Sequence, residues 1–287
     1  MRRYQIFIDD QPKWQSSFSA LNIEIDISVS DLGTPRGNAL LRVYGVPLDE
    51  IKTSKQYEGK YVSIYGGMGK GMPLANPSQY GLLATGKVHQ CFGNWSGTDQ
   101  YIEFNIVPDD RAKNITLEWV AGSSLGDALK AALSAAYPTA NITNLTDDVK
   151  LDYDNHGYYS SVEALATIAK KYNPKLVIIK NGGDITITDK PKDTSKTISI
   201  NDFIGQPTWI DANTIGFTCV MRGDIDLTTT IDMTMAITGN TQQGAYGTQK
   251  NMLTETGKFQ VTFVRHLGNY RNTDAGAWST TIEAVTL

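Results

Sequence analysis

The most suggestive chemical motif in the sequence is the glycine-rich stretch GGMGKG at residues 66–71. A phosphate-binding loop of this kind needs a helix directly after it, because the helix N-terminus supplies N–H donors and a positive dipole. The residues that follow, MPLANP, include two prolines, and neither Ser nor Thr follows Lys70. We therefore interpret residues 66–81 as a flexible loop between two strands, one that could still dock onto a partner.

The three histidines, His89, His156 and His266, are the next candidates for chemistry. Asp152, Asp154 and His156 together resemble a metal cluster, but transition-metal sites usually use more than one histidine or cysteine ligand. A calcium loop would need a dozen residues and a closing glutamate, which the sequence lacks here. We expect a solvated loop, with no metal and no cofactor.

Motifs for nucleophilic catalysis are missing from the sequence: it has no Gly-x-Ser-x-Gly and no His-Glu-x-x-His. The carboxylate pairs at residues 109–110 and 147–148 lie where elements are expected to end, so we interpret them as caps. Cys91 and Cys219 share no CxxC spacing and are expected to be reduced, although a disulfide between them stays open. The tryptophans are too scattered to form a sugar-binding strip and are interpreted as core or interface anchors. We expect no enzymatic activity.

One sequence motif occurs twice in the chain, each time at a predicted strand. Gly-Asn-aromatic-x-x-Thr-Asp occurs at Gly93 and again 175 residues later at Gly268, each time before a predicted strand. Because Asn and Gly tolerate positive φ, each copy could turn one strand back on the next. Two hairpins with the same turn chemistry predict one domain present twice.

Three regions with different patterns follow one another along the chain. Residues 1–110 and 196–287 are rich in alternating strands, and residues 21–29 place apolar side chains at every odd position. Residues 111–195 contain predicted helices at 125–137 and 161–172, the first with Leu125, Leu129 and Leu133 on one face. Residues 238–256 are interpreted as a mobile loop. We predict a β domain at 1–110, an α+β insert at 111–195 and a second β domain at 196–287.

Composition limits the class of protein. The chain has 287 residues, 40% of them hydrophobic, and a formal net charge of −4. This charge argues against specific nucleic-acid binding, which needs a basic surface. No apolar run approaches the roughly 20 residues needed to cross a bilayer, so we expect no membrane partner.

With these elements placed, the chain resembles the baseplate hub proteins of contractile-tailed bacteriophages and related tail-like particles. Three stretches carry the resemblance: NALLRVYGVPLDEI at 38–51, DFIGQPTW at 202–209, and GKFQVTFVRHLGNYR at 257–271 with the closing strand WSTTIEAV at 278–285. The order of the three stretches along the chain makes the resemblance specific.

The resemblance implies a mainly β fold with two tandem tube-type β-barrel domains, related by duplication, and an α+β insert. It implies a structural virion protein made in the host cytoplasm, a homotrimeric hub that joins the hexameric tail tube to the trimeric central spike. The implied partners are further copies of the chain, a tail tube or tube-initiator protein and the spike, with wedge or tape-measure proteins as further candidates. The loops 66–81 and 238–247 would then order against neighbouring tail proteins. No partner-binding residue is assigned.

Other functions stay open at this point. A cell-wall-degrading enzyme should carry a pair of catalytic carboxylates, and none is visible. A glycan-binding tail protein would need an exposed aromatic platform. A distal tail or tube-initiator ring would be a hexamer of single barrels, against which the internal repeat argues.

Overall fold

The structure is a computed structural model that describes residues 2–29, 31–32, 39–69, 77–107, 114–181, 184–192, 195–244 and 247–287. It divides into two compact units, one made of residues 1–29, 37–108 and 192–287, the other of residues 30–36 and 109–191. The expected division into three domains stays a prediction, because these units group the two β-rich regions together. No described helix is long and apolar enough to cross a membrane.

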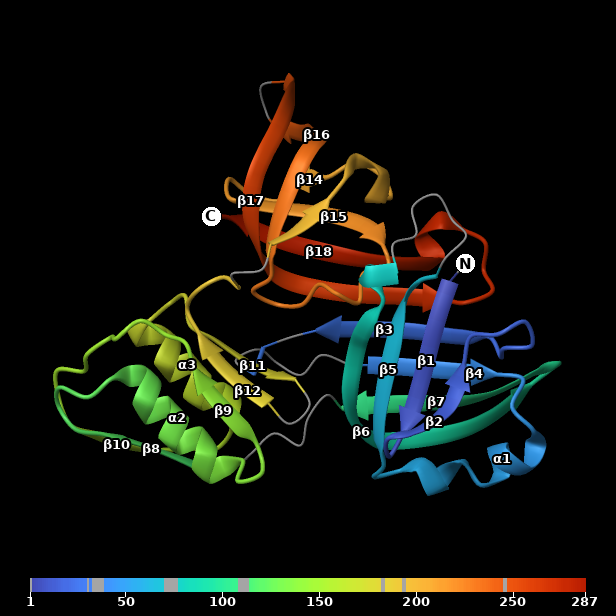
Figure 1. Ribbon diagram of the computed structural model, residues 1–287, viewed down its shortest axis with the longest axis horizontal. Helices are drawn as coiled ribbons and strands as arrows, with labels where there is room; N and C mark the ends of the chain where they lie inside the picture. The colour runs from blue at the N-terminus through green and yellow to red at the C-terminus, as the bar shows by residue number, and fades with distance from the viewer. Residues whose placement is uncertain are drawn as a thin grey trace. The chain divides into compact units, whose positions relative to one another are not determined.

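The N-terminal part of the first unit is a series of antiparallel strands with one short helix (Figure 1). Ile23, Ile25 and Ile27 are buried on one face, as their period of two predicts. The elements are β1 (Arg2–Ile8), β2 (Gln11–Gln15), β3 (Ile23–Val29), β4 (Ala39–Tyr44), α1 (Leu48–Lys52), η1 (Ser54–Tyr57), β5 (Tyr61–Met68), η2 (Pro77–Gln79), β6 (Gly81–Ser96) and β7 (Asp99–Val107).

The C-terminal part of the same unit is again mainly β and has its own apolar core, which includes Phe217, Phe259 and Ile282. Its elements are β13 (Ser195–Ile198), η3 (Ile200–Asp202), β14 (Thr208–Trp209), β15 (Thr214–Val220), β16 (Thr230–Gly244), β17 (Gly247–Asn269), η4 (Ala275–Ala277) and β18 (Trp278–Thr286). Residues 238–244 and 247–255, expected as part of a loop, are paired in the β16–β17 hairpin. That expectation was wrong because it relied on the glycine-rich composition of the stretch, whereas strand pairing uses backbone groups.

One pairing order occurs twice in this unit. The neighbours run β5-β6-β7-β4-β3 in the N-terminal part and β16-β17-β18-β15-β14 in the C-terminal part, with every pair antiparallel. A β-bulge also lies at the same place, after Val88 in β6 and after Val261 in β17. We call each set of five strands a five-strand group.

The motif that first suggested the repeat does not occupy equivalent positions in the two groups. The bulges align Val88 with Val261, 173 residues later rather than 175. Gly93 lies inside β6, and the first hairpin turns at Gly97, which has a φ of 60°. Gly268 lies next to Ile25. A Cβ added to Gly268 would lie 2.6 Å from Ile25 Cγ1. Each copy of the motif does lie at a hairpin turn, between β6 and β7 and between β17 and β18, as predicted. Gly93 and Gly268 themselves do not have positive φ, and Gly268 instead permits close packing.

The two groups share one sheet. Residues 264–269 of β17 pair with β3, so the strand order runs from β14 through β17 and β3 to β2. Figure 1 shows β3 alongside the C-terminal strands. The described order is open at both ends, and the expected closure of each group into a barrel is not seen. Closure would need β16 to pair with β14 and β5 to pair with β3, and neither pair is hydrogen-bonded in the described residues.

The second unit is an α+β fold, as the sequence predicts. Leu125, Leu129 and Leu133 are buried in its core. A short segment from between β3 and β4 joins this unit: Leu32 N–H donates to Ile178 O at 2.8 Å, and buried Asp31 pairs with Lys170 at 2.8 Å. The elements are β8 (Ile115–Trp119), α2 (Leu125–Ala136), β9 (Asn141–Asn144), β10 (Asn155–Tyr159), α3 (Val162–Tyr172), β11 (Val177–Asn181) and β12 (Asp184–Thr188). The predicted hairpin of β11 and β12 is confirmed.

Backbone contact between the two groups generates a first prediction. A Cβ on Gly81 would lie 2.1 Å from Gly223 O, and Gly223 N–H donates to Gln79 O at 2.9 Å. Because backbone cannot rotate away, we expect Gly81→Ala to lower the free energy of unfolding by about 1–3 kcal/mol. Chemical denaturation followed by circular dichroism measures this. Gly276→Ala is the matched control, since its Cβ would meet nothing within 4 Å. Equal stability of the two variants would contradict the packing described here.

Candidate functional site

The first residues of the glycine-rich motif, 66–68, are part of the sheet. Gly66 and Gly67 lie in β5 and pair with Tyr4 and Arg3 of β1. Gly67 O accepts a hydrogen bond from the buried Trp278 indole at 3.0 Å. Residues 70–76, including Lys70, lie outside the described residues. The expected loop 66–81 is therefore strand at 66–68, and its first glycines allow the two five-strand groups to approach.

The three histidines lie apart, in different settings. His266 is buried, and its Nδ1 lies 2.9 Å from Thr280 Oγ1. Burial lowers the pKa of His266 to about 4, because a charged imidazolium would lose its hydration there. His156 is exposed on β10, with Nδ1 2.7 Å from Glu118 Oε1, and His89 is exposed beside the β6 bulge.

The expected solvated loop at residues 152–156 is partly strand, because Asn155 and His156 pair with Trp119 and Glu118 of β8. Asp154 Oδ1 accepts a hydrogen bond from Ala121 N–H at 2.7 Å. In the described part of the chain no three His, Cys, Asp or Glu side chains gather to hold a metal. That the chain needs no metal or cofactor stays a prediction.

The cysteines are both free and buried, in separate cores. Burial raises the pKa of Cys91 and of Cys219 to about 12. A thiol with so high a pKa is almost fully protonated at neutral pH and is a poor nucleophile. The disulfide that the sequence left open is not formed.

Polar side chains form a ladder across the junction between the two groups. Arg265 donates two hydrogen bonds to Asp26, of 2.9 and 2.7 Å, and this pair lowers the pKa of the Asp26 carboxyl. Next to it, Asn269 Nδ2 donates to Glu24 Oε1 at 2.8 Å. Both contacts join β17 to β3. These side chains are partly exposed, so each pair adds at most about 1 kcal/mol, and their main effect is on register.

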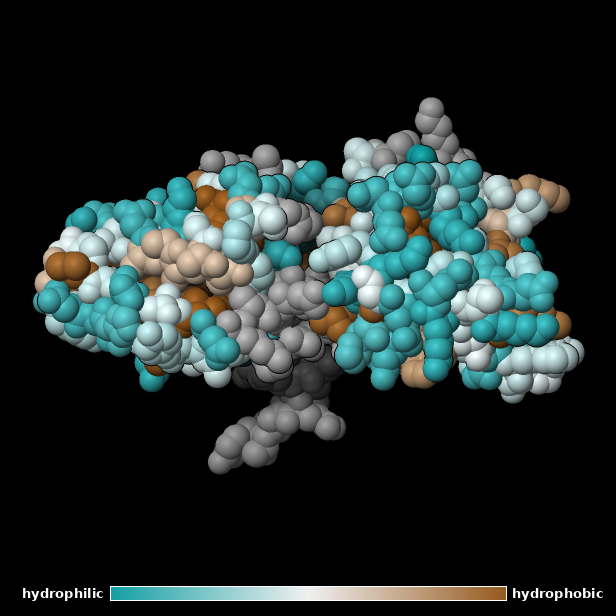
Figure 2. Space-filling model, turned by 90° about the horizontal axis from the view of Figure 1, so that it is seen from below, coloured by the Kyte–Doolittle hydropathy of each residue, from teal (hydrophilic) through white to brown (hydrophobic). Residues whose placement is uncertain are grey.

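The same ladder continues over the N-terminal group. Glu24 accepts from the Tyr44 hydroxyl at 2.7 Å, and Arg42 Nε donates to Glu103 at 2.6 Å. The ladder thus crosses β17, β3, β4 and β7 on the face opposite the apolar core. A face of this kind is suited to contact with water or with a polar partner. Elsewhere, Figure 2 shows apolar groups as small separate patches among hydrophilic residues.

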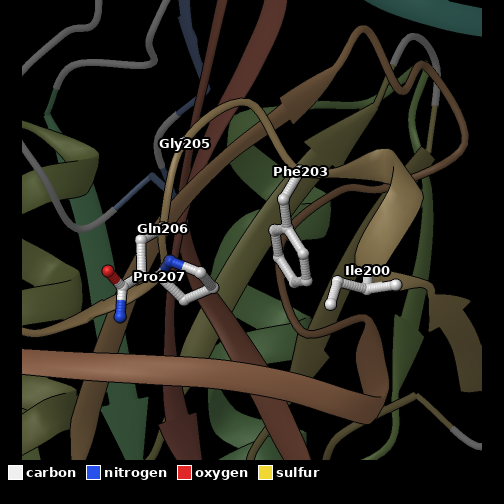
Figure 3. Close-up of a pocket in the computed structure, with 5 residues that line it drawn as sticks. All are labelled: Ile200, Phe203, Gly205, Gln206 and Pro207. Atoms are coloured by element: carbon white, nitrogen blue, oxygen red, sulfur yellow. The ribbon is translucent and has the colours of Figure 1, made fainter.

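The described pocket lies along the outer edge of the C-terminal group. It has a volume of about 270 Å³ and is lined by Ile200, Phe203, Gly205, Gln206 and Pro207. Figure 3 shows Ile200 and Phe203 on one side of it and Gln206 with Pro207 on the other. The Phe203 ring is fixed by an edge-to-face contact with Phe217, with ring centroids 5.3 Å apart.

The backbone at this pocket is an edge strand. Phe203 bridges Cys219 and Trp209 pairs with Ile215, so residues 203–209 run along the outer side of β15. No described strand is hydrogen-bonded to their other side. We call residues 203–209 the acceptor edge.

A second uncovered element is the end of the β6–β7 hairpin. β5 pairs with β6 only as far as Lys87, and residues 92–99 are exposed on both strands. Phe92 is 50% exposed and Trp95 is 63% exposed. An exposed hairpin that carries two large aromatic residues is a candidate surface for contact with another molecule. We call residues 91–96 the β6 arm.

The five tryptophans, interpreted from sequence as core or interface anchors, divide in the structure. Trp119 and Trp278 are buried, and Trp95 is the most exposed. Nothing in the sequence pattern distinguishes Trp95 from the other tryptophans or marks residues 203–209 as an edge. The exposure of Trp95 and of residues 203–209 depends on which strands lie next to them. The order in which strands pair cannot be predicted from a single sequence.

Comparison with known proteins identifies the fold. No protein-family model and no curated protein sequence matches the chain. The tail protein from Neisseria meningitidis MC58 is similar in structure, with a TM-score of 0.56 and 10% identity over 99% of this chain and 96% of that chain. The 43 kDa tail protein of prophage MuSo2 from Shewanella oneidensis has a TM-score of 0.59 and 9% identity, over 99% and 98% of the two chains. At these identities the likeness shows the fold alone, and for the fold it confirms the resemblance to tail proteins.

Buried His266 generates a prediction on pH. Its folded pKa of about 4 lies below the unfolded value of 6.5, so between these pH values the unfolded chain binds more protons than the folded chain. Stability should therefore fall as the pH is lowered through this window, by roughly 3 kcal/mol for this group alone. Urea unfolding at pH 7 and pH 4.5 measures the change. We expect His266→Asn to show a smaller loss than the wild type, and an equal loss in both would contradict the assignment.

Proposed function

We propose that this protein is a structural component of a phage-like tail, present in the assembled virion and without catalytic activity. The observation that carries the proposal is the shared fold with two tail proteins over almost the whole length of all three chains. The settings of the described histidines and cysteines agree with it. Burial keeps both thiols protonated, and the Thr280 hydroxyl beside His266 is fully buried, out of reach of a substrate.

Within the tail, we place the chain as a baseplate hub that joins a hexameric tube to a trimeric spike. The support is the pairing order that occurs twice, which fits two tube-type domains produced by duplication. Three copies of a twice-repeated domain offer six similar units to a sixfold partner while keeping true threefold symmetry. The polar ladder on β17, β3, β4 and β7 is a suitable wall for a water-filled central channel.

The proposed partners are further copies of the chain, a tail tube or tube-initiator protein, and the spike. Wedge or tape-measure proteins are candidates for the periphery. The insert differs from both five-strand groups in fold, so it is the part best suited to break the sixfold similarity and meet a threefold partner.

The mass of the assembled protein tests this function. We expect native mass spectrometry of the purified chain to give a species of three chains, each of 31.5 kDa, because the duplicated groups make a ring of six units from three copies. A species of six chains would instead favour a tube-initiator ring and contradict the hub.

A further inference from the structure

The junction inside the chain offers a template for a contact between copies. In β17, Val261 N–H donates to Thr229 O, and past the bulge residues 264–269 are covered by β3. In β6, Val88 N–H donates to Lys60 O at the same point before the corresponding bulge. The β6 arm, residues 91–96, therefore corresponds to residues 264–269.

The arm differs from its counterpart because no described strand pairs with it where β3 pairs with β17. Cys91 N–H donates there to the Glu58 carboxylate, at 3.3 Å, and Gly93 packs against the Ile51 backbone of α1. This explains why Phe92 and Trp95 are exposed. The missing neighbour would be the counterpart of β3.

The counterpart of β3 in the C-terminal group is the acceptor edge. β3 pairs with β4 as β14 pairs with β15. Across the N-terminal group, Ile27 pairs with Ala39, and Ala39 pairs with Ile106. Across the C-terminal group, Trp209 pairs with Ile215, and Ile215 pairs with Ala284. Ile27 and Trp209 therefore occupy corresponding positions. The acceptor edge, too, has no described strand hydrogen-bonded to its outer side.

We infer that the β6 arm of one copy adds as a strand to the acceptor edge of a second copy, with Trp95 seated in the pocket beside Phe203 and Pro207. The register follows from the junction inside the chain. Gly268 pairs with Ile25, which is two residues before Ile27; its counterpart Trp95 then faces Pro207, two residues before Trp209. This inference rests on the ring proposed above and names the contact that closes it.

The chemistry of the two surfaces agrees with this register. The pocket volume of about 270 Å³ is below the roughly 300–1,000 Å³ of small-molecule sites, but it can hold an aromatic side chain. The Trp95 indole N–H already donates to Gly97 O at 2.9 Å, so its burial leaves no donor unpaired. The contact joins two different surfaces, and such head-to-tail contacts form rings when the rotation closes.

Cross-linking between single variants tests the contact. Trp95→Cys and Gln206→Cys chains are mixed, allowed to exchange and treated with a short bifunctional maleimide. We expect a two-chain product from the mixture and none from either variant alone, because the contact brings the arm to the edge and not to itself. The wild type controls for Cys91 and Cys219, which are buried.

Failure of this contact can be told apart from failure of the proposed function. A three-chain mass with no product from the mixture would overturn the contact and leave the ring in place. A product from Trp95→Cys alone would also overturn it, because arms would then meet arms. A single-chain mass with no product would overturn the ring as well.

Assembly strength gives a second readout. We expect Trp95→Ala to raise the dissociation constant of the assembly at least about tenfold, since buried tryptophans are frequent hot spots. Tyr158→Ala is the control, because Tyr158 is an aromatic residue of the insert that is 76% exposed. Equal effects of the two substitutions would contradict the inference.

Discussion

The antiparallel pairing of β17 with β3 is the interaction on which the rest of this structure depends. It turns two five-strand groups into one sheet. A slip of one residue would move every side chain of a strand to the other face. The Asp26–Arg265 and Glu24–Asn269 contacts cross this pair on the polar face and favour one register. On the other face, Gly268 lets Ile25 and Trp278 pack closely.

This junction also explains why the two apolar cores are separate yet linked. The N-terminal core takes in Met221 and Trp278 from the C-terminal part. The Trp278 indole reaches Gly67 O, and Gly223 N–H reaches Gln79 O. Backbone groups of one five-strand group are thus satisfied by the other, which places small residues at the contact. The glycines that resemble a phosphate-binding loop in sequence have a structural role here.

Much of the local structure could be predicted from the sequence, because period-two and helical patterns reflect burial directly. Ile23, Ile25 and Ile27 and the leucines of α2 are buried as predicted. The repeated motif in the sequence points toward the pairing order that occurs twice, but its two glycines do not occupy matching positions. The features that do match are the bulges after Val88 and after Val261, and the sequence does not mark them. The acceptor edge and the β6 arm could not be found either, since exposure there depends on which strands are neighbours.

One strand contact occurs within the chain, and we infer that it recurs between copies. Amide hydrogen exchange at residue resolution, in dilute single chains and in the assembled protein, distinguishes the two sites. We expect the Gly93 and Trp95 amides, which face away from β7, to exchange rapidly in single chains and at least about tenfold more slowly after assembly. Residues 265–268 should be protected in both states. Unchanged exchange at Gly93 and Trp95 on assembly would contradict the claim.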